Sequence, residues 1–440
     1  MNPAVDTAGE PSPAQGPATG RSRHANFLPR RVVHLVGHVT AEVLSFLAPA
    51  TQALAQDGVT QHVIVMKLDA GARRISKWGL AAGATVELLD PEAKPVLRWH
   101  RLAQALNRAL ASDRRAVLHL HGYVPALLGS LALMVARRRT PTVYSPHGSH
   151  VLQSALPFAA LLRAVSPTST SSIANHSFES SQLSGQTSAP VHLAECPLPP
   201  ALLRLERAEG DRARVVAGAL ERAVQGVYET ARMAVLLGDD GQGVQFEWMG
   251  ALDDAGRAVL HAVGVPSFGN PEVAEPADHT PAQPQAGGAP FDAHTDAHTE
   301  GDTDADADAC LARLAGAWVH LAPVPVTHFP VLLVQAMALG LPCVALDVPY
   351  HRALIRHGET GFLCQTAHDM LHWTATLVQS PTLRAQVGAA AREHARARFG
   401  EEQFRHALLA AYAASVARHA VRGVVVAPRA AWVSDAGMTR

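Results

Sequence analysis

Two short loops of this sequence place histidines where they could contact a ligand. The predicted strand 141–145 runs into Pro146 and His147, and His147 precedes Gly148, which has no side chain to cover the imidazole. In a doubly wound α/β sheet, ligands bind beyond the carboxyl ends of the strands. We therefore expect His147 to lie in a ligand crevice. The alternative that the local sequence leaves open is a buried histidine with a structural role only.

The second loop has histidines at alternate positions, His119 and His121, followed by Gly122. Side chains two residues apart on a β-strand share one face, so this pair could bind a metal ion jointly. The sequence reveals no third ligand near the pair, and the cysteines of the chain form no spacing typical of a metal site. We therefore predict no metal site and no metal requirement.

A third feature that could bind a ligand is the helix predicted to begin near Pro330. Proline suits the first turn of a helix, where a backbone N–H would have no partner within the helix. The other N–H groups of that turn attract phosphate oxygens, and this backbone effect survives changes of side chain. The segment therefore predicts a phosphate-binding site.

The elements that must position these groups alternate between strands and helices. Strands are predicted over 32–36, 62–66, 86–89, 117–121, 141–145, 214–218, 244–249, 317–321 and 343–346. Helices are predicted between them and near 226–237, 380–399 and 401–419. This rhythm indicates parallel doubly wound sheets, so the fold class is α/β. Because 440 residues exceed what one core normally holds, we expect two such domains.

Composition indicates where the domains begin and end. We expect a disordered leader over 1–29, a first Rossmann-like domain over 30–200, a second over 201–400, a C-terminal helix over 401–420 that could pack back on the first domain, and a tail over 421–440. The leader lacks the apolar core of a signal peptide. Residues 266–309 contain six prolines and ten acidic but no basic residues. Such a segment buries too little apolar area to offset its ordering entropy, so we expect a disordered acidic insertion.

Charge and hydropathy restrict the partners. The net charge of −1 argues against a nucleic-acid partner. Outside the acidic insertion, however, 37 basic residues face 28 acidic ones. A mildly basic body suits an anionic substrate or an anionic membrane surface, unless it is only a solvated surface. No apolar run reaches the roughly 20 residues of a spanning helix, so membrane contact should be peripheral.

The segment from Pro323 to Pro342 resembles the donor-site segment of GT-B glycosyltransferases of the GT4 type. It has the sequence P-V-P-V-T-H-F-P-V-L-L-V-Q-A-M-A-L-G-L-P, where the family usually has P-S-x-x-E-G-F-P-x-x-x-x-E-A-M-A-x-G-x-P. The H-x-H-G at 119–122 and the P-H-G at 146–148 also resemble the N-terminal domain of that family. The resemblance implies two Rossmann-like domains that face each other across a cleft. It also implies a nucleotide-diphosphate sugar as donor substrate, with no cofactor.

Transferred position by position, the resemblance implies three groups of site residues. The candidate catalytic residues are His147, Thr327 and Gln335. The candidate donor-binding residues are Gly37, Gly218, Arg222, His328, Phe329, Pro330, Val331 and Arg352. The candidate acceptor-side residues are His121 and Gly148.

Several ligand-facing positions depart from the usual residues of the family. Thr327 and Gln335 occupy the positions of two glutamates, so neither side chain carries a charge. Ala219 and Gln225 occupy the positions of the arginine and lysine that bind the donor diphosphate. One preorganised contact of this kind contributes roughly 3 kcal/mol to transition-state stabilisation. Tyr350 replaces a glycine that lets the backbone approach the donor.

Two functions remain open for this set of residues. The first is a retaining glycosyltransferase that moves a hexose from a nucleotide-diphosphate sugar to a glycan or lipid-linked acceptor, in bacterial-type surface polysaccharide assembly. In it, Arg222 or Arg352 would replace the lost cations. The alternative is a catalytically silent GT-B protein that binds a nucleotide, a glycan or a partner glycosyltransferase. No G-x-G-x-x-G follows a predicted strand, which argues against a dinucleotide oxidoreductase. We expect a cytoplasmic location, with peripheral contact at the inner membrane face as a further option.

Overall fold

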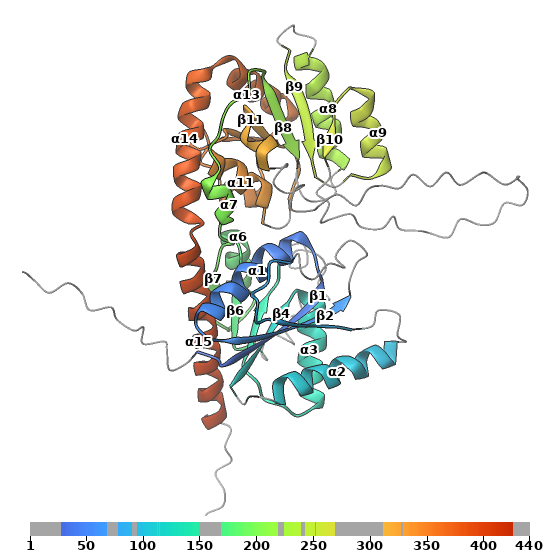
Figure 1. Cartoon of the computed structure of the whole chain (residues 1–440), viewed down its shortest axis with the longest axis vertical. Helices are drawn as coiled ribbons and strands as arrows, with labels where there is room; N and C mark the ends of the chain where they lie inside the picture. Colours follow the sequence, from blue (N-terminus) through green and yellow to red (C-terminus); the bar gives the residue numbers. More distant parts are fainter. Residues whose placement is uncertain are drawn as a thin grey trace, which may run out of the picture.

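The computed structural model describes residues 28–67, 78–89, 95–111, 113, 115–148, 169–218, 224–238, 243–250, 252–268, 311–326 and 329–425. Within these residues the chain forms two α/β domains, one above the other in Figure 1, with the last long helices beside them. The predicted leader, acidic insertion and tail lie largely outside the described residues.

The N-terminal domain is built on a seven-stranded parallel sheet in the order β3-β2-β1-β4-β5-β6-β7. Its strands are β1 (Arg31–His38), β2 (Thr60–Lys67), β3 (Thr85–Leu88), β4 (Ala116–His121), β5 (Thr142–Ser145), β6 (Ser171–Ala174) and β7 (Val191–Leu193). Its helices are α1 (Ala41–Gln56), α2 (Pro95–Ala111), α3 (Tyr123–Val135) and α6 (Ser177–Ser184). Helices α2 and α3 cover one face of the sheet and α1 covers the other (Figure 1). The strand order reverses between β1 and β4, which is where such a sheet forms its ligand crevice.

Side-chain alternation along β1 and β4 explains which residues face which helices. Val33 and Leu35 belong to the core beneath α2 and α3, so His34 between them points to the opposite face. On β4, His119 and His121 point to that same face, and the parallel register sets His34 beside His119. Three histidines from two neighbouring strands therefore share the face that α1 covers.

The C-terminal domain is built on a six-stranded parallel sheet in the order β10-β9-β8-β11-β12-β13. Its strands are β8 (Arg214–Gly218), β9 (Gln245–Met249), β10 (Ser267–Phe268), β11 (Val319–Ala322), β12 (Cys343–Leu346) and β13 (Phe362–Cys364). Its helices are α7 (Pro200–Arg204), α8 (Val224–Gly238), α9 (Asp254–Ala262), α11 (Val331–Leu339), α12 (Pro349–Arg352), α13 (Ala367–Gln379) and α14 (Pro381–Arg398). Helices α8 and α13 pack on one face, and α11 and α14 on the other.

Two glycines of this domain are required by the backbone. A Cβ atom on Gly218 would stand 1.9 Å from the carbonyl oxygen of Met249 on the neighbouring strand. Gly340 ends α11 in the left-handed region, with φ 83°, and its N–H caps the last carbonyls of the helix. The glycine at 218, a candidate donor-binding position, is therefore already explained by close strand packing.

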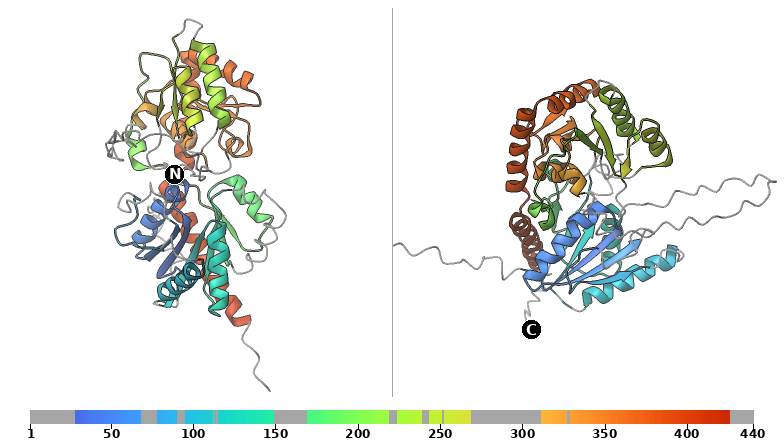
Figure 2. Two further views of the ribbon diagram at one scale, coloured as in Figure 1. Left: turned by 90° about the vertical axis from the view of Figure 1, so that its right-hand side faces the viewer. Right: turned by 45° about the horizontal axis from the view of Figure 1, so that its top comes forward.

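The chain passes between the domains twice, and the two crossings lie side by side. The first follows β7 and includes Cys196 and Leu198; the second is Phe399–Gly400, which separates α14 from α15 (Glu401–Val425). The Leu198 N–H donates a hydrogen bond to the Phe399 carbonyl, at 3.0 Å. Helix α15 then packs on α1 and on β4, β5, β6 and β7, and Figure 2 shows it alongside the N-terminal domain in two further views. The last helix of the described chain thus helps α1 to cover the face that bears the three histidines.

The predicted fold class is confirmed, because both domains are α/β with parallel sheets and flanking helices. In the described part of the chain, no helix combines the length and the apolar character that crossing a bilayer requires.

Candidate functional site

A cavity of about 280 Å³ lies between the two domains, where α1 faces the start of α11. Three of the predicted site residues line it from the C-terminal domain: Phe329, Val331 and Gln335. Ser45 and Ala48 line it from α1, and the first interdomain crossing contributes further walls. Pockets for whole small-molecule ligands usually measure about 300–1,000 Å³. This cavity therefore has room for part of a larger ligand.

The start of α11 forms one wall of this cavity. Pro330 precedes the first helical residue, and the Val331 N–H donates to the Phe329 carbonyl at 2.9 Å. The remaining N–H groups of the first turn belong to Leu332 and Leu333, and they have no partner within a helix. Gln335, one turn along from Val331, is partly exposed on the cavity side. Thr327 and His328 lie outside the described residues.

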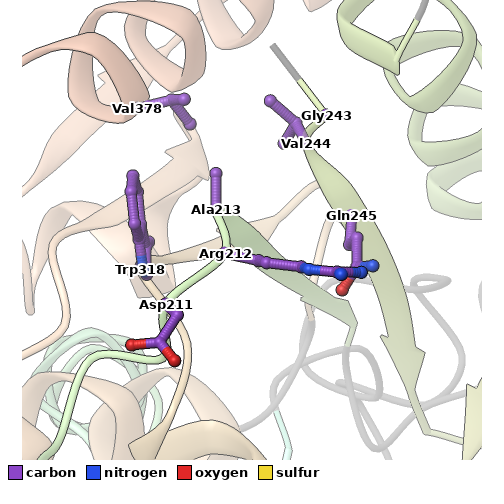
Figure 3. Close-up of a pocket in the computed structure, with 8 residues that line it drawn as sticks. All are labelled: Asp211, Arg212, Ala213, Gly243, Val244, Gln245, Trp318 and Val378. Atoms are coloured by element: carbon purple, nitrogen blue, oxygen red, sulfur yellow. The ribbon is translucent and has the colours of Figure 1, made fainter.

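A larger cavity of about 670 Å³ lies at the opposite edge of the C-terminal sheet (Figure 3). Its walls include Arg212, Gln245 and Trp318, which lie at or just before the amino ends of β8, β9 and β11. Ligands of doubly wound sheets bind at the carboxyl ends, and no predicted site residue lines this cavity. We therefore place the candidate site in the smaller, interdomain cavity.

The P-H-G loop after β5 has an unusual backbone that a buried carboxylate fixes. His147 has φ 50° and Gly148 has φ 133°, so both lie in the region that L-residues rarely adopt. The Gly148 N–H donates to Glu179 Oε1 at 2.9 Å, and the Asn175 N–H donates to Glu179 Oε2 at 3.0 Å. Glu179 is fully buried. A residue held in this conformation by surrounding contacts is often a sign of function.

The His147 side chain points into the N-terminal domain. It is only 7% exposed, and its Nε2 lies 2.9 Å from Nδ1 of His121. It is therefore more covered than the loop sequence alone suggests, because the ring turns inward against His121 and Phe46. Burial lowers the pKa of His147 to about 3, so the ring is neutral at physiological pH.

Replacing Glu179 with glutamine is expected to lower the free energy of unfolding by about 1–3 kcal/mol, the cost of leaving a buried group without its hydrogen bond. The NH₂ of the new amide would then face one of the two backbone N–H groups that now donate hydrogen bonds to the carboxylate. Chemical denaturation measures the effect, with the exposed Glu359→Gln as the matched control. Equal stability of Glu179→Gln and wild type would show that the carboxylate does not fix the loop.

Two further candidate donor residues that the structure describes, Arg352 and Gly37, do not line the interdomain cavity. Arg352 is 58% exposed in its side chain and pairs with Asp347 through two hydrogen bonds, of 2.5 and 3.0 Å. The Arg352 hydrogen bond holds the pKa of Asp347 below its usual range. Gly37, near the end of β1, lies against the ring of Pro125. Arg222 lies outside the described residues, so its proposed role stays a prediction.

Two residues of this region escaped the sequence analysis. Glu179 makes contacts across long sequence separations, which no local pattern reveals. His34 could have been noticed as a polar residue inside the apolar strand V-V-H-L-V. Its ring nitrogen lies within 4.8 Å of ring nitrogens of His119 and His121, so the pair has the third neighbour that the sequence did not reveal.

Two family models match the chain. Residues 297–394 match the glycosyl transferases group 1, and residues 49–186 match glycosyltransferase family 4. No curated protein matches the chain.

Solved structures with a similar fold cover most of the chain. HepE from Anabaena in complex with UDP and glucose is 13% identical with a TM-score of 0.61, over 86% of this chain and 97% of that one. Sucrose-phosphate synthase from Thermosynechococcus elongatus is 15% identical with a TM-score of 0.63, over 86% and 96%. A glycosyltransferase from Rickettsia africae is 10% identical with a TM-score of 0.65, over 87% and 98%.

At these identities the solved structures define the fold class, GT-B, in which two Rossmann-like domains face each other. With the two family models, they show that the chain belongs to the GT-B glycosyltransferases of the GT4 type. The family predicted from residues 323–342 is thereby confirmed.

Proposed function

We propose that the protein is a retaining glycosyltransferase that transfers a hexose from a nucleotide-diphosphate sugar to a glycan or lipid-linked acceptor. The proposed setting is bacterial-type surface polysaccharide assembly. The observation that carries this proposal is the interdomain cavity, lined by Phe329, Val331 and Gln335 from the segment that resembles a donor site. HepE, a solved structure of the same fold, is described in complex with UDP-glucose, which supports a donor of this class.

The backbone at the start of α11 supplies the main contact to the donor in this proposal. The N–H groups of Leu332 and Leu333 would attract the diphosphate, and the helix dipole adds to that attraction. Gln335 would hydrogen-bond the hydroxyls of the nucleotide ribose. These contacts need neither a charged side chain nor a metal ion, which suits the substitutions at Thr327 and Gln335.

The proposed transfer breaks the bond between the anomeric carbon and the donor phosphate oxygen. The acceptor hydroxyl oxygen forms the new bond on the same face of the sugar, and its proton passes to the leaving phosphate. In this scheme the phosphate itself serves as the base, so a missing carboxylate is not fatal. His147, Gly148 and His121 remain the proposed residues of the acceptor side.

A catalytically silent GT-B protein is the second candidate function. The ion pair between Arg352 and Asp347 favours this function. The Arg352 guanidinium could have replaced the cations that usually bind the diphosphate, but it is already paired with a carboxylate. The burial of His147 favours it too, because little of the ring is available to a substrate.

A peripheral membrane contact would suit a lipid-linked acceptor. The end of α3 exposes the apolar side chains of Met134 and Val135, each 66% exposed, and is followed by the exposed Arg137 and Arg139. Apolar and basic groups side by side favour the surface of an anionic bilayer. The structural alternative is that basic residues at the C-terminus of a helix merely interact with its dipole.

Calorimetric titration with uridine and guanosine diphosphates and their sugars, followed by assays of donor hydrolysis, tests the proposal. We expect binding at millimolar concentration or below and measurable hydrolysis or transfer. Failure to bind any of these nucleotides at millimolar concentration would rule out the enzyme. Binding without hydrolysis or transfer to a broad acceptor panel would identify the silent protein.

Restoring the usual charged residues provides a sharper version of that test. The triple variant Thr327→Glu, Gln335→Glu and Ala219→Arg is expected to bind the donor at least about tenfold more tightly, since one charge-assisted hydrogen bond contributes about 1.5–3 kcal/mol. The matched control is Gln245→Glu, an exposed position at the opposite edge of the C-terminal sheet. An unchanged affinity of the triple variant would contradict the proposed correspondence of these positions with a GT-B donor site.

A further inference from the structure

A group of four buried histidines lies inside the N-terminal domain, on the sheet face that α1 and α15 cover. His34 belongs to β1, His119 and His121 to β4, and His147 follows β5. None of them is more than 7% exposed. The ring centroids of His119 and His121 are 4.0 Å apart, and those of His34 and His121 are 5.3 Å apart. Burying four imidazoles costs free energy unless their ring nitrogens are satisfied, because each ring brings two polar atoms out of water.

Hydrogen bonds account for most of these polar atoms. His34 Nδ1 lies 3.0 Å from His121 Nε2, and His121 Nδ1 lies 2.9 Å from His147 Nε2. His119 lies 2.7 Å from the Tyr412 hydroxyl through Nδ1 and 2.8 Å from Ser145 Oγ through Nε2. Tyr412 comes from α15, so the C-terminal helix takes part in the cluster.

Three polar atoms in or beside the cluster lack a hydrogen-bond partner among the described residues, namely His34 Nε2, His147 Nδ1 and Gln61 Oε1. The amide nitrogen of Gln61 donates to the Thr51 carbonyl at 2.6 Å, which leaves the amide oxygen as the group that faces the histidine. Burial lowers the pKa of His34 to about 4, although the interaction with Gln61 partly opposes this. Burial also lowers the pKa values of His119 and His121 well below the usual value. The three rings are therefore neutral at physiological pH, and a neutral ring has a lone pair to offer.

We propose that His34, His119 and His121 together bind one divalent transition-metal ion, with Zn²⁺ as the best-suited species. One ring nitrogen from each lies within 4.8 Å of the other two. Two nitrogens bound to the same tetrahedral zinc at about 2.0–2.1 Å lie about 3.4 Å apart. The distance of 3.0 Å between His34 Nδ1 and His121 Nε2 is already close to that value. A ring nitrogen of His119, now within 4.8 Å of the other two, would have to move closer to them and give up one of its two hydrogen bonds.

The surroundings of the three rings support metal binding. A ligating histidine usually donates its other ring N–H to a polar group, which orients the ring. His147 Nε2 is in place to accept from His121, and the Tyr412 hydroxyl or Ser145 Oγ from His119. The oxygen of Gln61, otherwise unpaired, is the acceptor for His34. Imidazole ligands without carboxylates or thiolates suit zinc, copper or nickel, and they do not suit magnesium or calcium.

Such an ion would connect the buried cluster to the candidate acceptor side. With Nε2 of His121 on the metal, its proton must lie on Nδ1 and point at His147 Nε2. That contact would fix the tautomer of His147 and add to the contacts that hold the P-H-G loop. The metal would therefore act as a positioning element in the N-terminal domain, at a place separate from the proposed donor contacts.

Zinc analysis after chelation tests the proposal. The full chain is stripped with a chelator, dialysed against Zn²⁺, passed over a weak chelating resin and analysed for zinc per chain. We expect one tightly bound ion in the wild type and in the control His261→Asn, an exposed histidine of α9. We expect that ion to be lost in His34→Asn and in His121→Asn. The histidines of the acidic segment 266–309 remain in every variant, so only the difference between variants reports on the cluster.

Spectroscopy keeps the proposal testable even if the variants fold poorly. Cu²⁺ bound to the stripped wild type should show electron paramagnetic resonance coupling to several imidazole nitrogens, and Zn²⁺ should displace it. Equal zinc in wild type and His34→Asn, or no tightly bound ion in the wild type, would overturn the proposal. The cluster would then be a metal-free chain of hydrogen-bonded imidazoles.

Discussion

Replacing Tyr350 with alanine is expected to lower the free energy of unfolding by about 3–5 kcal/mol, the usual cost of truncating a large buried aromatic side chain. Tyr350 is 2% exposed and belongs to α12 of the C-terminal domain, yet its ring packs against residues of the N-terminal domain. The centroid distances are 4.5 Å to His176 and 5.4 Å to Phe178. The His176 ring also hydrogen-bonds to the Tyr350 carbonyl, at 3.2 Å. The residue that replaces the family's usual glycine thus fills space between the two domains.

Chemical denaturation of the full chain measures this effect, and two variants serve as controls. Tyr350→Phe keeps the ring and the backbone carbonyl, so it should lose at most about 1.5 kcal/mol, the upper range for one hydrogen bond. Tyr228→Ala removes a side chain that is 55% exposed on α8 and should change stability by less than about 0.5 kcal/mol. If Tyr350→Ala were as stable as Tyr228→Ala, the ring would not join the domains in solution.

Lowering the pH from about 7 to about 5 is expected to reduce the free energy of unfolding by about 4 kcal/mol through two histidines outside the cluster. Burial lowers the pKa of His176 to about 3 and that of His320 to about 4, from the usual 6.5. Between these values and 6.5 the unfolded chain binds more protons than the folded protein. The stabilisation is complete above 6.5 and is lost as the pH falls toward the folded-state pKa. Each histidine costs about 1.4 kcal/mol per pH unit in this window, or about 2 kcal/mol by pH 5.

Substitutions can separate this effect from other titrations. His320→Gln should reduce the pH-dependent loss by about 2 kcal/mol, the share of one such histidine, whereas His406→Gln, whose side chain is 70% exposed, should not reduce it. Carboxyl groups with lowered pKa, such as those of Asp347 and Glu209, titrate below this window and do not obscure it. A stability that stays constant from pH 7 to pH 5 would contradict the burial of both histidines.

The regular part of the fold could be predicted because its strands are apolar. The strands at 32–36 and 117–121 consist of buried aliphatic residues with a few histidines, and the alternation with helices indicates parallel sheets. Strand β6 could not be predicted in this way. Ser171 and Ser172 are buried there although they are polar. Just before it, the Thr170 hydroxyl finds partners in the Thr142 carbonyl and in Ser415 of α15. Such partners come from distant sequence and leave no local pattern.

The start of helix α13 carries a local sequence pattern that predicts it. Thr366 and Asp369 form a capping box, in which each side chain accepts a hydrogen bond from the backbone of the other. The same threonine and aspartate, three residues apart ahead of an apolar run, are a sequence-level sign of a helix start. Local chemistry of this kind can be predicted. Hydrogen bonds that polar strand residues form with distant parts of the chain cannot.

The candidate site contains residues of both kinds, those that a local motif predicts and those that only the fold brings together. Phe329, Val331 and Gln335 are close together in sequence, so one local motif predicts all of them, and the structure brings them to one cavity. His34 and Glu179 reach the P-H-G region from other strands and helices, and only the folded chain shows that they belong to it.

Calorimetric titration of two tryptophan variants of α1 tests most directly whether the cavity between α1 and α11 is the donor site. Ala48 lines the cavity, whereas Ala55 on the same helix is exposed and lies outside it. An indole ring at position 48 would occupy much of the roughly 280 Å³, so Ala48→Trp should bind the diphosphate sugars at least about tenfold more weakly than wild type. Ala55→Trp should bind them as wild type does. Equal affinity of Ala48→Trp and wild type would contradict the assignment of this cavity as the donor site.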